Sequence, residues 1–121
     1  FQQVHQMIST VSSTLKDEIN NIDAIKNAFP MGSMTGAPKV IAMELIEQYE
    51  QTKRGLYSGA VGYFAPNGNF DFNVVIRSIQ YNKQNNYLNI MVGGAITFDS
   101  IAEQEYEECL LKAKATMQVL E

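Results

Sequence analysis

The segment that decides the fold is residues 57–81, with the sequence YSGAVGYFAPNGNFDFNVVIRSIQY. Residues 57–65 are small, aromatic or β-branched, and the Pro-Asn-Gly-Asn cluster at 66–69 is typical of a hairpin turn. Along 70–81 the side chains alternate, so that one set faces one side of a long strand (Phe70, Phe72, Val74, Ile76) and the other faces away (Asp71, Asn73, Val75, Arg77). The segment therefore predicts two antiparallel strands joined by a tight turn.

Downstream of this hairpin, a second turn at 83–86 and a third strand at 87–92 extend it into an antiparallel meander. Gly93 and Gly94 then break the strand. Ser100, with Glu103 three residues later, predicts a capping box that begins a last helix running to the end of the chain.

Upstream, apolar residues at helical spacing predict three helices, over 4–15, 22–29 and 38–49. An asparagine caps the second helix, Pro30 ends it, and the third stops before the polar run 50–54. The predicted order of elements is α-α-α-β-β-β-α. This order indicates an α+β fold in which helices flank an antiparallel sheet meander.

The composition excludes several classes of function. The chain has 121 residues, a net charge of −4 and 45% hydrophobic residues, which is typical of one packed domain or a piece of one. An acidic chain argues against a nucleic-acid partner and against a basic membrane-surface helix, and no apolar run is long enough to span a bilayer. The single Cys109 excludes an internal disulfide, and no signal peptide is visible, so we expect a reduced, cytoplasmic setting.

Two glycine-containing segments are candidates for ligand binding. The segment 32–39, GSMTGAPK, begins a helix and would present free N–H groups to an anion, although it lacks the Gly-Lys-Ser/Thr of a phosphate-binding loop. The alternative is an ordinary helix start capped by Thr35. Gly93-Gly94-Ala95 would let backbone approach a ligand closely, and the alternative there is a simple turn or bulge.

Charged side chains supply the remaining candidates. Arg77, placed mid-strand among apolar residues, predicts bidentate binding of a carboxylate ligand. The alternatives are a structural pair with an internal acid and an edge arginine that extends to solvent. Glu105 and Glu108 are three residues apart on one helix face and can hold a hard cation such as magnesium. The alternative is a solvated acidic first turn with an ordinary Glu108–Lys112 pair. The lone His5 has no nucleophile nearby in the sequence to act with.

Several blocks together resemble the chorismate-binding enzymes. These are FPMGSMTGAPKVIAMELIEQYE from 29, YSGAVGYF from 57, VVIRSI from 74, GGAITFDS from 93 and EYEECLLKAKA from 105. The resemblance covers nearly the whole chain and implies that residues 1–121 are the C-terminal portion of a two-layer catalytic domain, with its N-terminal part absent. Phe29-Pro30 followed by Gly-Ser-x-Thr-Gly resembles the branch that forms 4-amino-4-deoxychorismate more than the branch that forms anthranilate.

By this resemblance, a pocket would bind chorismate through six residues: Ser33, Tyr57, Arg77, Gly94, Ala95 and Lys112. Glu105 and Glu108 would bind Mg²⁺, and Glu108 and Lys112 would be the catalytic side chains. Ammonia would come from a glutamine amidotransferase partner.

The resemblance also implies that part of the machinery lies before Phe1. The other magnesium-binding glutamates of the family and the lysine nucleophile of the aminodeoxychorismate branch are upstream. We therefore expect residues 1–121 alone to be inactive, with apolar area and strand edges uncovered. Two positions differ from the family pattern: Gln6 stands where relatives carry histidine, with His5 one residue earlier, and Ala95 stands where relatives carry glycine. A non-catalytic α+β binding module is the alternative of a different class.

Overall fold

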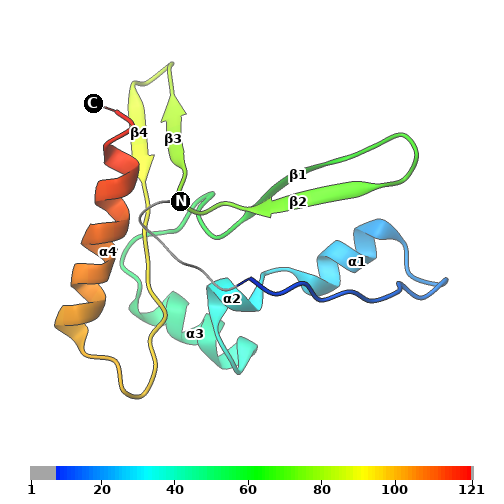
Figure 1. Ribbon diagram of the computed structural model, residues 1–121, viewed down its shortest axis with the longest axis horizontal. Helices are drawn as coiled ribbons and strands as arrows, with labels where there is room; N and C mark the ends of the chain where they lie inside the picture. The colour runs from blue at the N-terminus through cyan, green and yellow to red at the C-terminus, as the bar shows by residue number, and fades with distance from the viewer. Residues whose placement is uncertain (1–7, 121) are drawn as a thin grey trace.

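The computed structural model describes residues 8–120 and confirms an α+β chain of helices and antiparallel strands (Figure 1). The His5 and Gln6 predictions lie outside the described residues. The helices and strands are α1 (Asn21–Ala28), α2 (Gly32–Thr35), α3 (Lys39–Tyr49), β1 (Ala60–Phe64), β2 (Phe70–Val74), β3 (Ile79–Asn82), β4 (Tyr87–Ile90) and α4 (Ala102–Met117). None of the helices described is long and apolar enough to cross a membrane.

The strands form two separate antiparallel hairpins. In the first, β1 pairs with β2 from Ala60↔Val74 to Phe64↔Phe70, and the turn closes where Gly68 takes a φ of 86°. In the second, β3 pairs with β4 from Ile79↔Ile90 to Asn82↔Tyr87. Both predicted turns are confirmed, because glycine and asparagine tolerate the left-handed backbone that tight hairpin turns require.

The predicted single strand over 70–81 is wrong, because the chain breaks at 75–78. Arg77 has a φ of 49°, in the left-handed region that ends strand pairing. The Ser78 hydroxyl donates to the Ile76 carbonyl at 2.8 Å and closes the bend locally. Arg77 is therefore a bend residue between two hairpins, and the meander is divided at this point.

The helix predicted over 4–15 is also wrong where it can be compared, since residues 8–15 are not helical. Five of the six residues 9–14 are Ser or Thr, whose hydroxyls compete for backbone hydrogen bonds and weaken helices. The other three helices are confirmed. Asn20 caps α1 by accepting from the Asp23 N–H at 2.9 Å, and Pro38 precedes α3.

Two predicted caps are absent. Ser100 does not cap α4, because its hydroxyl accepts from the Thr97 N–H at 2.9 Å and donates to Glu105 Oε1 at 2.6 Å. Thr35 does not cap α3, because it lies inside the single turn of α2 and donates to the Met31 carbonyl. A hydroxyl with a nearer backbone partner is not free to cap a helix.

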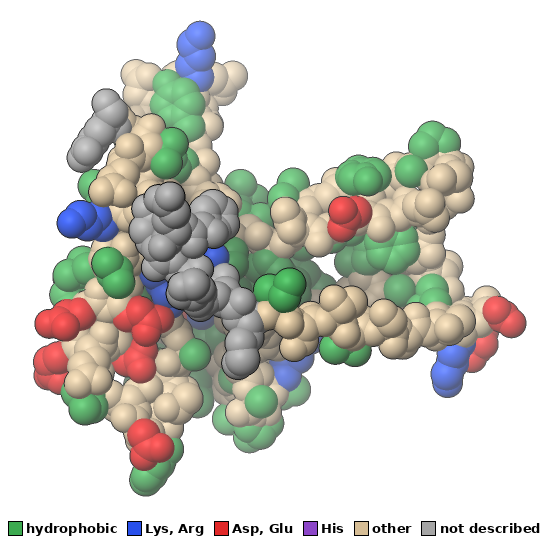
Figure 2. Space-filling model, viewed as in Figure 1, with side chains coloured by type: hydrophobic (Ala, Val, Ile, Leu, Met, Phe, Trp, Pro, Cys, Tyr) green, Lys and Arg blue, Asp and Glu red, His purple; other side chains and the backbone are tan. Residues whose placement is uncertain are grey.

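Apolar side chains of the described residues are exposed or half-buried, and none of them is fully buried. Phe64, Phe70 and Phe72 cluster along the first hairpin, with ring centroids 5.5 to 6.3 Å apart, and Figure 2 shows hydrophobic side chains along this arm. Two-stranded hairpins are only marginally stable by themselves in water. The expectation of uncovered apolar area is confirmed.

Candidate functional site

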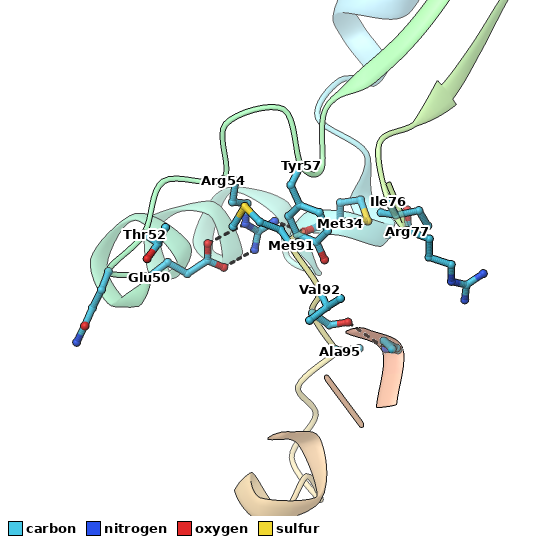
Figure 3. A pocket seen from close by; sticks show the side chains of 15 residues that line it. Met34, Glu50, Thr52, Arg54, Tyr57, Ile76, Arg77, Met91, Val92 and Ala95 are labelled. Carbon is cyan, nitrogen blue, oxygen red and sulfur yellow. Dashed lines mark hydrogen bonds and ion pairs between the residues drawn. The ribbon is translucent and has the colours of Figure 1, made fainter. Parts of the chain in front are cut away.

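One open pocket of about 490 Å³ lies where five segments meet (Figure 3). They are α2 at 33–34, the segment 50–57 after α3, the bend at 76–77, the strand end at 91–95, and Lys112 of α4. Its volume is in the range of small-molecule sites. All six residues expected to bind substrate line it: Ser33, Tyr57, Arg77, Gly94, Ala95 and Lys112.

Lys112 ties α4 to the strand end. Its Nζ donates to the Gly93 carbonyl at 3.0 Å and forms an ion pair with Glu108 one turn earlier. The two side chains are 33% and 52% exposed, so the ion pair by itself contributes only about 0.3–0.5 kcal/mol. The contact with Gly93 places a positive charge at the pocket wall formed by 91–95.

Gly93 and Tyr57 approach each other closely. A Cβ added at Gly93 would lie 2.8 Å from the Tyr57 hydroxyl oxygen, which is too short for a normal contact. The tyrosine tip therefore packs against a backbone position that only glycine leaves open. This close approach brings the 54–58 turn against the 91–95 segment.

The next two residues, Gly94 and Ala95, offer backbone donors. Neither N–H has a hydrogen-bond acceptor within residues 8–120. Free N–H groups beside a lysine suit an anionic ligand. Ala95 keeps this N–H although it adds a methyl group.

Arg77 lines the pocket from the bend, and its position corrects the prediction of a mid-strand residue. Among the described residues the ion pairs are Glu50–Arg54 and Glu108–Lys112, so the Arg77 guanidinium has no carboxylate partner there. In Figure 3 its side chain extends away from the Tyr57 ring. Within this part of the chain, Arg77 is thus available to a carboxylate ligand.

Glu105 and Glu108 face Gly94 from α4. Their nearest carboxylate oxygens would lie 3.0 and 4.0 Å from a Cβ added at that glycine, so both point toward one backbone position. Neither lines the pocket. Residues 8–120 hold no group of three or more potential metal ligands. Two oxygen-donating carboxylates fit Mg²⁺, which binds through one or two of them and keeps water or substrate as its other ligands.

Arg54 organises one wall of the pocket, although no pattern in the sequence had singled it out. Its Nε and one terminal nitrogen donate to the two oxygens of Glu50 at 2.8 and 2.5 Å. Its other terminal nitrogen donates to the Met34 carbonyl at 2.8 Å and to the Ser58 hydroxyl at 3.2 Å. The Glu50–Arg54 spacing of four was the one signal in the sequence.

The Glu50–Arg54 ion pair also shifts the pKa of both side chains. Hydrogen bonding from Arg54 holds the pKa of the Glu50 carboxyl below its ordinary value, although partial burial opposes this shift. The same hydrogen bonds raise the pKa of the Arg54 guanidinium. Both groups are therefore charged at neutral pH.

Known proteins match this chain along its whole length. Residues 1–118 match the family described as chorismate binding enzyme. The chain is 47% identical over all 121 residues to a probable aminodeoxychorismate synthase, chloroplastic, from Oryza sativa subsp. japonica, covering 13% of that protein. Over 95% of the chain it is 44% identical to the aminodeoxychorismate synthase, chloroplastic, of Arabidopsis thaliana, covering 12% of it.

A second kind of relative is nearly as similar. The chain is 42% identical over its full length to anthranilate synthase component 1 of Methanothermobacter marburgensis, covering 26% of that protein. The chain thus spans between 12% and 26% of the length of these three relatives.

Proposed function

Since the chain belongs to the chorismate-binding enzymes, we propose that it is the C-terminal portion of the catalytic domain of an aminodeoxychorismate synthase. The full-length protein would convert chorismate to 4-amino-4-deoxychorismate, with ammonia supplied by a glutamine amidotransferase. The single observation that carries this choice of reaction is the identity of 47% and 44% to two aminodeoxychorismate synthases. The pocket supports a small acid as substrate, because an arginine without an acidic partner in residues 8–120, a lysine and two backbone N–H groups line it.

Chorismate carries two carboxylates, and the pocket offers donors of matching chemistry. Arg77 binds one carboxylate with its guanidinium fork, and the Tyr57 hydroxyl adds a donor. The N–H groups of Gly94 and Ala95 and the Ser33 hydroxyl orient the rest of the molecule. Each of these five residues lines the cavity.

Lys112 and Glu108 are the proposed catalytic pair. The Lys112 ammonium lies at the 91–95 wall and stabilises negative charge that develops on the substrate. Glu108 orients this ammonium through their ion pair.

Glu105 and Glu108 would hold magnesium, together with substrate oxygens and water. When bound, the ion supplies positive charge that draws electrons from the ring and eases loss of the C4 hydroxyl. Support for this assignment is the convergence of both carboxylates on Gly94, beside the proposed substrate site.

Formation of anthranilate is the second candidate function. The observation that favours it is the 42% identity to an anthranilate synthase component 1 over the full chain. Both reactions use the same substrate, so the pocket residues above serve either one.

The test is product analysis. The full-length protein is incubated with chorismate, Mg²⁺ and ammonium, and the products are identified by mass spectrometry. 4-Amino-4-deoxychorismate supports the proposal, anthranilate with pyruvate moves the protein to the second candidate, and intact chorismate refutes both. The Lys112→Met variant, which removes the proposed catalytic ammonium, should lose turnover. Gly32→Ala should not, because nothing lies within 4 Å of the added methyl group.

A further inference from the structure

Arg54 connects two of the five segments that build the pocket, the segment 50–57 and α2. Its guanidinium binds Glu50 at the end of α3 and the Met34 carbonyl in α2 (Figure 3), and it also donates to the Ser58 hydroxyl beside Tyr57. Four hydrogen bonds from one side chain use most of its donors. The side chain is only 23% exposed.

The two segments that Arg54 holds are short and contain only a few internal backbone hydrogen bonds each. α2 is a single turn of four residues, Gly32–Thr35, without a side-chain N-cap, and one turn is too short to be stable by itself. Ser58 adopts a φ of 69°, unfavourable for a serine, and is 8% exposed. Backbone hydrogen bonds at 3.0 Å, from the Tyr57 N–H to the Arg54 carbonyl and from the Ser58 N–H to the Val75 carbonyl, also hold this turn. The Arg54 guanidinium adds the side-chain link between the turn and α2.

Each of these two segments carries one of the protein hydroxyls that are proposed to bind the substrate. Ser33 lies in α2 next to Met34, and Tyr57 precedes Ser58. Both line the pocket. A movement of either segment would move a hydroxyl relative to the 91–95 wall.

We propose that Arg54 is a positioning residue for the substrate: it locks α2 to the 57–58 turn and so places the Ser33 and Tyr57 hydroxyls in the pocket. Glu50 orients the guanidinium but does not face these two segments directly. The identity of the substrate rests on the proposed function, whereas the locking of the two segments does not.

The first test compares Arg54→Met, Arg54→Lys and Glu50→Gln in the full-length protein, below the unfolding temperature of each variant. We expect Arg54→Met to raise the KM for chorismate about tenfold or more while changing kcat much less, as expected for lost binding in both ground and transition states. Arg54→Lys should recover part of this loss, since one ammonium can still reach one acceptor. Glu50→Gln should leave KM near the wild-type value, because both other contacts of Arg54 remain. An unchanged KM in Arg54→Met would overturn the proposal.

A double-mutant cycle separates positioning from general destabilisation. If Arg54 acts through Ser33, then Ser33→Ala should raise KM in the wild-type background and add little in the Arg54→Met background. If the two increases in KM multiply in the double variant, Arg54 does not act through Ser33, and the proposal is overturned.

Hydrogen exchange provides a readout that needs no substrate. Arg54→Met should speed amide exchange in 32–36 and 55–59 but not in α4, whereas Glu50→Gln should do so weakly. Uniformly faster exchange, or none, would overturn the proposal. If the wild-type protein leaves chorismate intact, the proposed function fails, and the exchange pattern still decides whether Arg54 locks these segments.

Discussion

Gly93 lies against the Tyr57 hydroxyl, and replacing it by alanine tests whether this close approach shapes the pocket. The added Cβ would lie 2.8 Å from the hydroxyl oxygen, so the oxygen must retreat by about 0.6 Å to reach an ordinary contact of 3.4 Å. Gly93 does not have a left-handed φ, so alanine adds a steric effect without backbone strain. A tyrosine ring turns about only two side-chain bonds and cannot easily avoid the methyl group.

Two consequences follow for the Gly93→Ala protein. Overpacking costs about 1–3 kcal/mol of folding free energy in a well-packed core, and at this partly exposed tyrosine we expect about 1 kcal/mol or less. A displaced hydroxyl also loses a hydrogen bond to a charged substrate, worth about 1.5–3 kcal/mol, so the KM for chorismate should rise roughly 10- to 150-fold. The assays are thermal unfolding of the ligand-free protein and steady-state kinetics.

The Tyr57→Phe background supplies the control. Without the hydroxyl, the nearest ring atom is Cζ at 3.8 Å from the added Cβ, which is an ordinary contact. Gly93→Ala should therefore cost almost nothing in that background, in stability and in KM. Equal losses in both backgrounds would refute the argument, because the clash would then not involve the hydroxyl.

Three further predictions concern charged groups around the pocket. Arg77→Ala should raise the KM for chorismate by more than tenfold, since a carboxylate partner is worth several kcal/mol; an unchanged KM in steady-state kinetics removes Arg77 from the site. Arg54 lowers the pKa of Glu50 from 4.5 in the folded protein. The ion pair therefore stabilises the folded state above pH 4.5, and this stabilisation is lost as the pH falls through the lowered pKa of Glu50. Unfolding of wild type and Glu50→Gln should therefore differ at pH 7 and converge in acid; a constant difference contradicts the assignment. Ser100→Ala frees Glu105 Oε1 and should weaken Mg²⁺ binding about tenfold, measured by titration calorimetry, with no change if Glu105 is not a ligand.

Much of the local structure could be predicted because its causes lie within a few residues. Asn20 and Pro30 bound α1, since a cap and a missing N–H act on the nearest turn. The turn at 66–69 follows in the same way from Gly68. The six expected substrate-binding residues that line the pocket were predicted by resemblance and not by spacing, since Ser33 and Lys112 lie in different helices far apart in the sequence.

Two of the wrong predictions involve contacts that the local pattern did not include. The alternation along 70–81 is uninterrupted in the sequence, yet the chain bends at Arg77 because the first hairpin ends where Ser58 and Gly59 pair with Val75. The Ser100 hydroxyl matched a capping box, but the turn to Thr97 redirected it. The pairing with Val75 joins residues far apart in the sequence, whereas Thr97 lies three residues before Ser100 and competes locally for its hydroxyl.

The sequence by itself determined the α+β class, three of the helices, both hairpin turns and the membership of the chorismate-binding enzymes, because periodicity, turn chemistry and motif blocks are properties of neighbouring residues. The tertiary structure alone decided that Arg77 stands at a bend without an acidic partner in residues 8–120, and that Arg54 joins α2 to the Tyr57 turn. Arg54 is 20 residues from Met34. Such a hydrogen bond depends on the path of the chain between its partners, and no local pattern specifies that path.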